Sequence, residues 1–224
     1  MKHYFDRIYC INLPHRTDRW KASLLEFEKL GIVDDVIKFN AVDIQPGIIG
    51  CTKSHYEIIK IAEQDKCENI LVFEDDLELT KHPSIAKEII SNSMEQLLRY
   101  YNAYDMLYLG GNVHEDKSLF RRIDENLSQI SICKTTHAYV ISKYAFKPFL
   151  NHFDNIDWED SWNWSQSNEQ RCNIDKWYIN NIHSKGRTFG VYPCLFNQRS
   201  NYSDLLHRNR DFVFSEKWDR VLAR

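Results

Sequence analysis

The stretch Asn69–Leu79 constrains the fold of this chain more than any other. Its first part, Ile70–Phe73, is an unbroken run of β-branched and bulky apolar residues, which is typical of a strand covered on both faces in an α/β sheet. The run ends at Glu74, Asp75 and Asp76. Adjacent carboxylates repel one another and are costly to bury, so they require water, a cation or a basic ligand.

The carboxyl edge of such a sheet is where open α/β folds bind their ligands. A hard divalent cation there, Mg²⁺ or Mn²⁺, would cancel the repulsion among the carboxylates and leave coordination positions for the oxygens of a diphosphate. The alternative is a solvated acidic turn, which is the better interpretation of an arbitrary run of acids. The apolar strand that precedes Glu74 favours a metal site instead.

Length and charge restrict the class of protein. A chain of 224 residues suffices for one domain with a well-filled core, and we expect a single domain over 1–224. The net charge of −3 does not indicate a nucleic-acid-binding protein, because binding to a phosphate backbone requires a basic surface. Residues 1–13 lack the apolar core of a signal peptide, and no apolar run approaches transmembrane length. We expect a cytoplasmic protein, for which peripheral membrane association stays open.

The six cysteines lie far apart and form no C-x-x-C pair, which argues against a structural zinc site. In apolar contexts and a reducing compartment, we expect them to be small core residues. The nine histidines are scattered too, and the default role of each is structural or on the surface. The sequence contains no signature of P-loop proteins, dinucleotide-binding proteins, serine hydrolases or zinc proteases. The cysteines are Cys10, Cys51, Cys67, Cys133, Cys172 and Cys194.

In the first half of the chain, apolar runs alternate with segments of helical periodicity, which predicts a mainly parallel α/β sheet. The expected strands are 7–13, 36–42, 70–73 and 105–109, and the expected helices are 17–30, one that opens at 50 and one that opens at 83.

Arg16 and Arg19 lie three residues apart at the start of the first expected helix, near the carboxyl end of the first strand. Guanidinium groups beside the positive end of a helix suit a phosphate, or a ribose and base. Two arginines on a helix surface are more often simply solvated, so this pair alone indicates little.

Gly50 opens the second expected helix, and Thr52 or Ser54 is its candidate cap. A free helix N-terminus beside a cleft suits a nucleotide. The alternative is an ordinary capped helix in which His55 packs against a neighbour. Helix geometry alone does not choose between these interpretations.

The second half of the chain has a different texture. The span 157–178 mixes tryptophans with carboxylates, which suits a carbohydrate cleft in which rings stack on sugars and acids bind hydroxyls. A lid or core patch with buried indoles is an alternative of equal weight. We expect short strands, some antiparallel, at 119–123, 128–133 and 137–142, helices over 143–153 and 174–184, a strand over 189–192 and a helical tail over 203–224.

Four segments in this order resemble glycosyltransferase family 25, which contains lipooligosaccharide galactosyltransferases and collagen hydroxylysine galactosyltransferases. Each segment alone is modest support, but their ordered combination is fairly specific. Weaker agreement continues to the end of the chain. The four segments are Ile11–Leu13 followed by Arg16 and Arg19, Gly50–Cys51 followed by Ser54–His55, Phe73–Asp76, and Thr136–Ser142, and the weaker matches are Asp175, Tyr192–Pro193, Gln198 and Ser200.

The resemblance implies an α/β protein of the GT-A type, with a Rossmann-like mixed, mainly parallel sheet flanked by helices. It places the nucleotide sugar in residues 1–115 and the acceptor in residues 116–224. It also implies a divalent metal, Mn²⁺ or Mg²⁺, and a UDP-sugar donor, most often UDP-galactose. The reaction implied is transfer of a hexose to a hydroxyl of a glycan, glycoprotein or glycolipid acceptor. The chain differs from the collagen enzymes in its short length and in lacking a secretory signal, so the acceptor is left open.

The resemblance also suggests roles for individual residues. Asp76 would bind the metal directly, Glu74 directly or through water, and Asp75 would face the ribose. His207 is a candidate for a late metal ligand. The residues expected to hold the nucleoside are Asn12, Arg16, Arg19 and, at the expected helix start, Gly50, Ser54 and His55.

Inverting transfer requires one general base to take the proton from the acceptor hydroxyl. Asp175 is the candidate because it lies in the matched C-terminal part, beside aromatic residues that suit an acceptor. Asp157, Glu159 and Asp160 are rivals, although a solvated loop is the better interpretation for each of them.

Two other functions stay open from the sequence. One is a nucleotide-sugar-binding module that has lost turnover. The other is a metal-dependent phosphoryl hydrolase, which ranks lower because Leu109–Gly111 and Leu13–Pro14 supply no further metal ligands at neighbouring strand ends.

Overall fold

The structure is a computed structural model that describes residues 2–101, 103–158, 173–203, 208–210 and 214–223. In its first half, β1 (Arg7–Asn12), β2 (Val36–Asn40), β3 (Asn69–Glu74) and β5 (Met106–Tyr108) alternate with the helices α1 (Thr17–Leu30), α2 (Gly47–Gln64) and α3 (Pro83–Tyr100). The short strands β4 (Leu77–Leu79) and β6 (Asn112–Val113) follow β3 and β5. The second half contains β7 (Phe120–Arg122), β8 (Leu127–Ile130), β9 (Cys133–Lys134), β10 (Ala138–Ser142), α4 (Lys143–Phe153), α6 (Ile174–Asn181), β11 (Thr188–Val191), β12 (Phe196–Gln198), β13 (Asn201–Ser203), β14 (Arg208–Arg210) and α7 (Ser215–Leu222).

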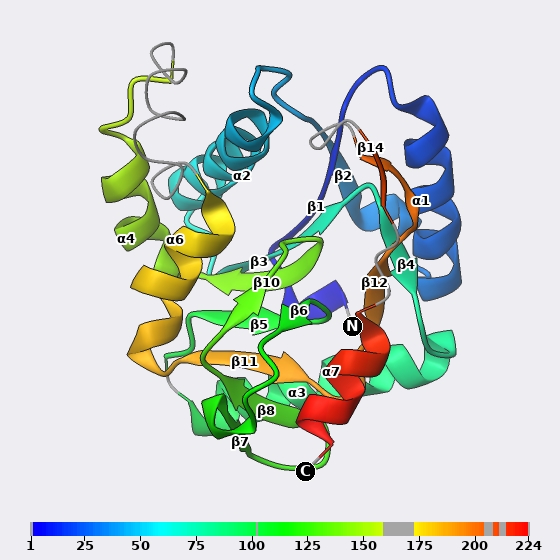
Figure 1. The fold of residues 1–224 in the computed structure, drawn as a ribbon, viewed down its shortest axis with the longest axis vertical. Helices are drawn as coiled ribbons and strands as arrows, with labels where there is room; N and C mark the ends of the chain where they lie inside the picture. The colour runs from blue at the N-terminus through cyan, green and yellow to red at the C-terminus, as the bar shows by residue number, and fades with distance from the viewer. Residues whose placement is uncertain (1, 102, 159–172, 204–207, 211–213, 224) are drawn as a thin grey trace.

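The central sheet has eight strands in the order β2-β1-β3-β10-β5-β11-β8-β7 (Figure 1). β1 pairs in parallel with β2 and β3, and β5 pairs in parallel with β11. β10 lies antiparallel between β3 and β5, and β8 is antiparallel to β11 and β7. The other six strands therefore share one direction. The mixed, mainly parallel sheet expected from the sequence is confirmed.

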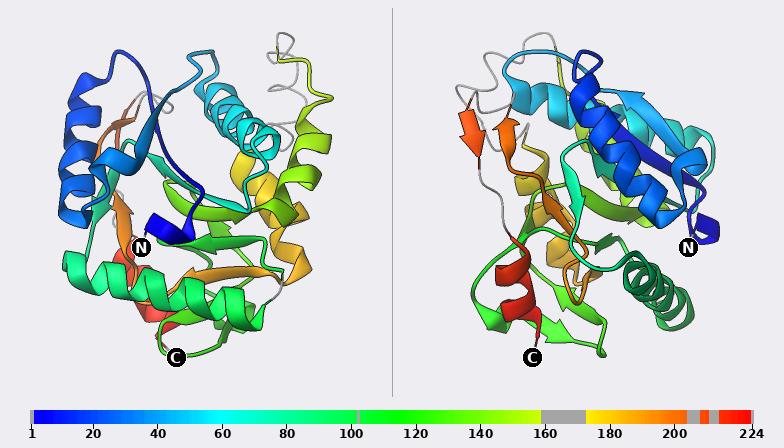
Figure 2. Two further views of the ribbon diagram at one scale, coloured as in Figure 1. Left: turned by 180° about the vertical axis from the view of Figure 1, so that it is seen from behind. Right: turned by 90° about the vertical axis from the view of Figure 1, so that its right-hand side faces the viewer.

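Alternate residues of each strand supply separate cores on the two faces of the sheet, as the period of two in a strand requires. From β1, Ile8 and Cys10 join the cluster beneath α1 and α3, whereas Tyr9 and Ile11 join the cluster beneath α2, α4 and α6. Figures 1 and 2 show helices on both sides of the sheet. The carboxyl ends of β1 and β3 thus belong to strands that are packed on both faces.

Several helix boundaries follow from local sequence. α1 and α4 have the predicted bounds. Gly31 ends α1 in the left-handed conformation with φ of 64°, which a residue without a Cβ adopts readily. Ser142 caps α4, since its side chain accepts a hydrogen bond from the backbone N–H of Tyr144.

The expected start of the second helix is wrong. α2 begins at Gly47, so Gly50 lies inside the helix rather than at its end. A Cβ on Gly50 would lie 2.4 Å from the carbonyl oxygen of Val42, and this close approach explains why glycine is needed there. Neither proposed cap acts on the helix start, because the Thr52 hydroxyl donates to the carbonyl of Ile48 and the Ser54 hydroxyl donates to that of Gly50.

The C-terminal part also differs from the prediction. Among the described residues of the tail expected to be helical over 203–224, the helix is α7, which follows the antiparallel pair β13–β14. The helix expected over 174–184 divides into α6 and a 3₁₀ turn at His183–Lys185, which Gly186 ends. No helix among the described residues has the length and apolarity needed to cross a bilayer.

The aromatic span 157–178 is described only at its two ends. Trp177 is buried, and Trp158 stacks on Phe153 with 6.0 Å between ring centroids. The positions of these two rings agree with the alternative in which the indoles form a core patch. Trp162, Trp164, Glu159 and Asp160 lie outside the described residues, as do Cys172 and His207. The cysteines predicted to be core residues are buried at Cys10, Cys67, Cys133 and Cys194, and Cys51 is partly exposed.

Candidate functional site

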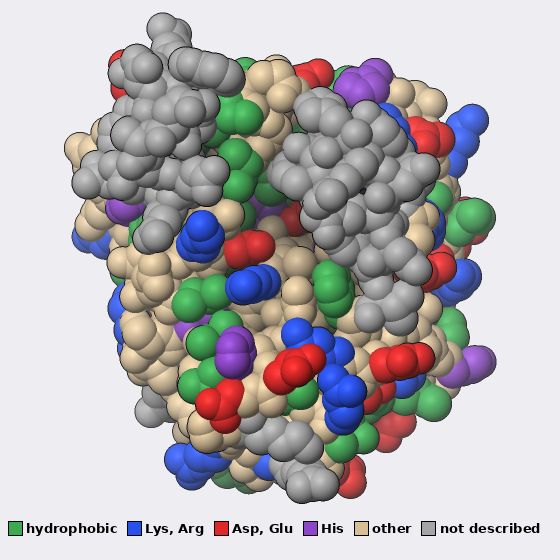
Figure 3. Space-filling model, in the orientation of Figure 1, with side chains coloured by type: hydrophobic (Ala, Val, Ile, Leu, Met, Phe, Trp, Pro, Cys, Tyr) green, Lys and Arg blue, Asp and Glu red, His purple; other side chains and the backbone are tan. Residues whose placement is uncertain are grey.

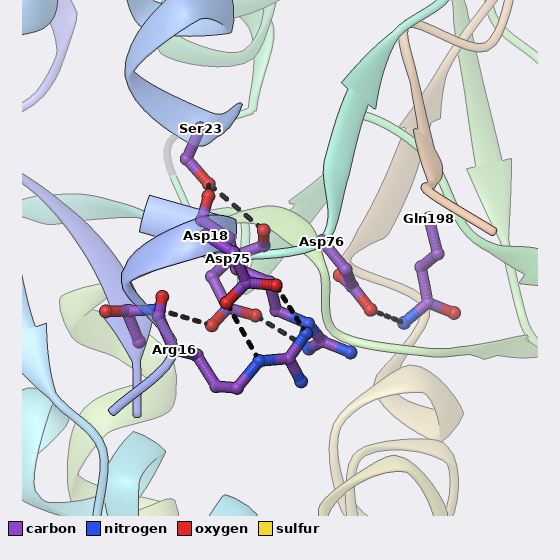
Figure 4. Close-up of polar contacts among 8 residues, drawn as sticks. Arg16, Asp18, Ser23, Asp75, Asp76 and Gln198 are labelled. Carbon is purple, nitrogen blue, oxygen red and sulfur yellow. Dashed lines mark hydrogen bonds and ion pairs between the residues drawn. The ribbon is translucent and has the colours of Figure 1, made fainter. Parts of the chain in front are cut away.

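Asp75 is held by groups of its own chain at the end of β3. The parallel register sets Ile11 opposite Glu74, so the next residue of each strand, Asn12 and Asp75, lie side by side. Asn12 Nδ2 donates to Asp75 Oδ2 at 2.6 Å, and Arg19 Nη1 donates to Oδ1 at 2.9 Å (Figure 4). Ser23 Oγ donates to the Asp75 carbonyl at 3.0 Å. Of the partners expected for these acids, Asp75 has a basic group, because the Arg19 guanidinium provides the buried counter-charge.

The electrostatics of Asp75 reflect this enclosure. Its side chain is buried, with 6% of the residue exposed, and that of Arg19 is 13% exposed. Burial raises the pKa of Asp75, and the charge of Arg19 opposes the rise. One partner of the pair cannot be removed without leaving a buried charge uncompensated.

Arg16 lies nearer the rim of the site. Its Nε and Nη2 donate to the two carboxylate oxygens of Asp18 at 3.0 and 2.9 Å, and this pair lowers the pKa of Asp18 to about 2 (Figure 4). Its carbonyl accepts a hydrogen bond from Asn12 Nδ2 at 3.0 Å. The structure therefore brings Asn12, Arg16, Arg19 and Asp75 together, and their contact with a nucleoside stays a prediction.

Glu74 points toward the strand on the other side, β10. Residue 138 pairs with residue 73 in the sheet, which brings Thr136 close to Glu74. Thr136 Oγ1 donates to Glu74 Oε1 at 2.6 Å, and His55 Nε2 lies 3.5 Å from the same oxygen. Burial acts to raise the pKa of Glu74, but the contacts with His55 and Thr136 outweigh it and lower that pKa.

Asp76 faces a third neighbour. Antiparallel pairing of β4 with β12 sets Gln198 opposite Leu77, and Gln198 Nε2 donates to Asp76 Oδ2 at 3.1 Å (Figure 4). Oδ1 is buried and accepts no hydrogen bond from the described residues. Burial, together with the charges of Glu74 and Asp75, raises the pKa of Asp76 to about 8.

These observations fit a cation-binding role for Asp76. A buried carboxylate oxygen without a donor, on a group whose ionised form is disfavoured by neighbouring acids, lacks positive charge. A divalent cation with oxygen ligands supplies that charge. Glu74 and Asp76 were the predicted metal ligands, and the charge of Glu74 acts on Asp76, although their hydrogen-bond partners lie on different sides of the strand end.

Asp175 belongs to the same group of charges. It lies in the first turn of α6, where the Asn173 side chain caps the helix by accepting from Lys176 N at 3.2 Å. Burial raises the pKa of Asp175 to about 6, a backbone hydrogen bond from Thr135 opposes the rise, and Glu74 adds to it. A carboxyl that titrates near neutral pH can exchange a proton with a substrate hydroxyl.

Gly50 and Ser54 contact other parts of the protein interior. Ser54 Oγ accepts a hydrogen bond from the backbone N–H of Val42 at 2.8 Å, and both residues are buried where α2 crosses the segment 42–44. The idea that they offer a free helix end is wrong, because that end is at Gly47. A direct contact between these residues and a nucleoside stays a prediction.

His55 packs as the alternative interpretation anticipated. It is fully buried, and its Nδ1 lies 2.9 Å from the hydroxyl of Tyr139 on β10. Thr136 and Gln198, which donate hydrogen bonds to Glu74 and Asp76, were not assigned to the site from the sequence.

The surface view agrees with an opening near these groups. The face in Figure 3 is hollowed between α2 and β1 as they are placed in Figure 1, and acidic and histidine side chains are visible in the hollow. A separate open cavity of about 460 Å³ lies at the end of α3 and contains none of the predicted site residues. Its lining is Asn92, Glu95, Gln96, Arg99, Tyr100 and 123–126.

The structure is that of an α/β protein with a cluster of carboxylates where the parallel strand β3 meets the antiparallel strand β10. The model of glycosyltransferase family 25, described as "LPS biosynthesis protein", matches residues 42–164. This match covers more than half of the chain, and the chain belongs to glycosyltransferase family 25. The resemblance seen in the sequence is confirmed, and the protein is a glycosyltransferase by family.

Solved structures of similar fold have low sequence identity to this chain. A197 from STIV is 11% identical, covers 92% of this chain and 94% of its own, and has a TM-score of 0.44. Mannose-1-phosphate geranyltransferase from Thermus thermophilus is 7% identical, with coverage of 83% and 72% and a TM-score of 0.46. A glycosyltransferase involved in glycosylation of the major capsid of PBCV-1 is 11% identical, with coverage of 83% and 92% and a TM-score of 0.38. These likenesses assign no activity to this chain.

Proposed function

We propose that this protein is a metal-dependent inverting glycosyltransferase that moves a hexose from a UDP-sugar to a hydroxyl of a glycan or glycoconjugate. The observation that carries the proposal is the state of Asp76. Its Oδ1 is buried without a hydrogen-bond donor among the described residues, and its pKa is raised to about 8 beside Glu74. A cation would stabilise the ionised form of this carboxylate, which supports metal-dependent binding of a nucleotide sugar.

Glu74 and Asp76 are the residues that would hold Mn²⁺ or Mg²⁺. The bound ion supplies positive charge that stabilises the departing diphosphate. Thr136 and Gln198 orient the two carboxylates, since each donates a hydrogen bond to one oxygen of its acid. The ligands are thereby positioned before the donor binds, which reduces the cost of assembling the site.

Asn12, Arg16 and Arg19 form the side of the site assigned to the nucleoside. Asn12 Oδ1 is buried and accepts no hydrogen bond within the described part of the chain, so it can accept one from a ribose hydroxyl or a base N–H. Asp75 lies next to it and is fixed by Arg19. The choice of UDP and of a ribose contact by Asp75 follows from the resemblance to the family, and the grouping of these polar residues supports a nucleoside on this side.

Asp175 is the proposed general base. Inversion requires one group to remove the proton from the acceptor hydroxyl as it attacks the sugar carbon and the diphosphate leaves from the opposite face. A pKa of about 6 keeps Asp175 ionised near neutral pH and gives it more basicity than an ordinary aspartate. The description of the family by LPS biosynthesis supports a glycan or glycolipid as the acceptor.

The first test is binding, because the donor defines the reaction before any acceptor is known. Titration with UDP-galactose, UDP-glucose and GDP-mannose, each with and without Mn²⁺, should give tight binding of one UDP-sugar only when Mn²⁺ is present. Metal-independent binding, or preference for the guanosine donor, would contradict the proposal. Release of UDP is then measured with a panel of acceptors, and binding without turnover on any of them would favour a nucleotide-sugar-binding module.

A further inference from the structure

A second set of ligand atoms lies on the side of Glu74 that faces away from Asp75. It consists of Cys51 Sγ, the ring nitrogen of His55 and a carboxylate oxygen of Glu74, and these atoms all lie within 4.8 Å of one another. Cys51 and His55 lie one turn apart on α2, and Glu74 is the last residue of β3. The group thus joins a helix to the central sheet.

The tautomer of His55 decides whether its Nε2 can bind a cation. Nδ1 lies 2.9 Å from the hydroxyl of Tyr139, which in turn lies 3.3 Å from that of Tyr178. When Nδ1 donates to Tyr139, Nε2 is left with a lone pair directed at the Glu74 carboxylate. In that tautomer two electron-rich atoms face each other, and a cation between them would remove the repulsion.

The separation of these atoms supports a metal ion rather than a hydrogen bond. His55 is fully buried, and Nε2 has no hydrogen-bond partner within the described residues. Its distance of 3.5 Å to Glu74 Oε1 is longer than a typical N–H···O bond. The nitrogen and oxygen ligands of a tetrahedral zinc ion lie about 3.4 Å apart, given metal–ligand bonds of roughly 2.0 to 2.2 Å.

We propose that Cys51, His55 and Glu74 form a binding site for a transition-metal ion of the zinc class, with Tyr139 orienting the imidazole ligand. The site is separate from the Asp76 side of the strand end, where Gln198 is the neighbour. It rests on the proposed function only in that both assign a metal to Glu74.

The ligand set selects the kind of ion. A thiolate, an imidazole and a carboxylate suit Zn²⁺ or Co²⁺ and disfavour Mg²⁺, which prefers oxygen ligands alone. Three protein ligands leave the fourth position of a tetrahedral ion open, as in catalytic rather than structural zinc sites. Cys51 and Glu74 are partly exposed, so this position can be reached from solvent.

The protonation of Cys51 is coupled to binding. Burial and the nearby acids hold the pKa of the free thiol well above its ordinary value, so the thiol is protonated when no metal is bound. Coordination releases this proton to solvent and forms the metal–sulfur bond. Binding should therefore tighten as pH rises.

The experiment uses Co²⁺ as a spectroscopic probe of the full chain. A cobalt–thiolate bond gives a charge-transfer band in the near ultraviolet, and tetrahedral cobalt gives intense visible bands. We expect both with one equivalent of Co²⁺, and we expect Zn²⁺ to remove them. Cys51→Ser should abolish the charge-transfer band and weaken Zn²⁺ binding at least tenfold. The matched control Cys67→Ser changes a buried cysteine outside the group and should keep the band.

Two further measurements separate this inference from the proposed function. Asp76→Asn should leave the cobalt bands unchanged, whereas Mn²⁺-dependent UDP binding should be weakened in Asp76→Asn and retained in Cys51→Ser. The inference is overturned when the wild-type protein shows no charge-transfer band, or when Cys51→Ser keeps it. Loss of the band in Asp76→Asn also overturns it, because one ion would then use both sides of the strand end. Thermal unfolding in a chelator confirms that each variant is folded.

Discussion

The three acidic residues at the end of β3 differ in the partners that the protein gives them, although they are adjacent in the sequence. Asp75 is enclosed by Asn12 and Arg19, so the chain itself neutralises it. Asp76 has a buried oxygen without a donor in the described part of the chain, and Glu74 faces the unpartnered Nε2 of His55. Consecutive side chains of an extended segment point in different directions, which is how one short run serves two purposes. The contacts of Asp75 favour stability, whereas Asp76 retains an oxygen to which no described residue donates a hydrogen bond.

The largest expected effect is on the rate of transfer and comes from Asp175, whose pKa is raised in part by Glu74. Replacement of Asp175 by Asn removes the proposed base and should lower kcat by roughly 10²- to 10⁴-fold. The Kd for the UDP-sugar with Mn²⁺ should change little, because Asp175 is assigned to the acceptor. Single-turnover rates and donor titrations measure the two quantities. Asp116→Asn is the control, since that exposed carboxyl bonds only to Ser118 among the contacts of the described residues. Wild-type turnover by Asp175→Asn would remove this residue from the mechanism.

Substitutions at the pair of Arg19 and Asp75 should change the free energy of unfolding. Arg19→Met leaves the buried carboxylate of Asp75 without its counter-charge and should cost about 3 to 5 kcal/mol of unfolding free energy. The double variant Arg19→Met/Asp75→Asn removes both charges and should recover most of that loss. Urea denaturation at neutral pH measures all three proteins. An unchanged midpoint for Arg19→Met would show that Asp75 is solvated and that the two sides do not differ.

Asp76→Asn should have the reverse effect on stability. The folded-state pKa of Asp76 is about 8, above the ordinary value of 3.8, so this group lowers the stability of the metal-free fold progressively as pH rises from about 4 to about 8. The variant should therefore unfold at a higher temperature than wild type in a chelator at pH 8. In the same variant, Mn²⁺-dependent UDP binding should weaken roughly 100-fold or more, because even residues that merely support a metal ligand cost 10- to 100-fold. Gain of stability together with loss of binding identifies an ion ligand.

How far the sequence predicts this molecule depends on whether a feature is local. α1 and α4 were predicted with their observed bounds, because Gly31 and Ser142 are end signals that act within one turn. The start of α2 was missed because Gly50 resembles a helix start. Its actual role depends on tertiary packing. A Cβ at this position would lie only 2.4 Å from the carbonyl oxygen of Val42, so only glycine lets the helix pass this close to the segment 42–44.

The candidate site divides in the same way. The acids Glu74–Asp76 were found from the apolar strand before them, which is a local pattern. Their partners Thr136 and Gln198 reach them through the registers of β10 with β3 and of β12 with β4. A register is set by the packing of whole strands, so no short motif carries it. The sequence therefore indicated the charges but not which of them the protein satisfies internally.

The pH profile sharpens the comparison further. Asp175 must be ionised to accept a proton, and its pKa is raised to about 6, so kcat/KM should fall about tenfold for each pH unit below 6. Glu74 contributes to the raised pKa of Asp175. A cation held by Glu74 should therefore move the inflection of the kcat/KM profile to lower pH. Profiles at limiting and saturating Mn²⁺ test the shift. An inflection near 4 at limiting metal would contradict the buried environment assigned to Asp175.

The smallest effect is expected at the rim, where Arg16 pairs with Asp18. Asp18 is 61% exposed, and pairs of this kind contribute less than about 1 kcal/mol. Its pKa is lowered to about 2, so any stability from the pair is present above pH 4 and is lost as pH falls toward 2. Asp18→Asn should thus lower the unfolding temperature slightly at pH 7 and not at all at pH 2. A loss as large as that of Arg19→Met would show that the rim pair, and not only the enclosed Asp75, holds α1 to the sheet.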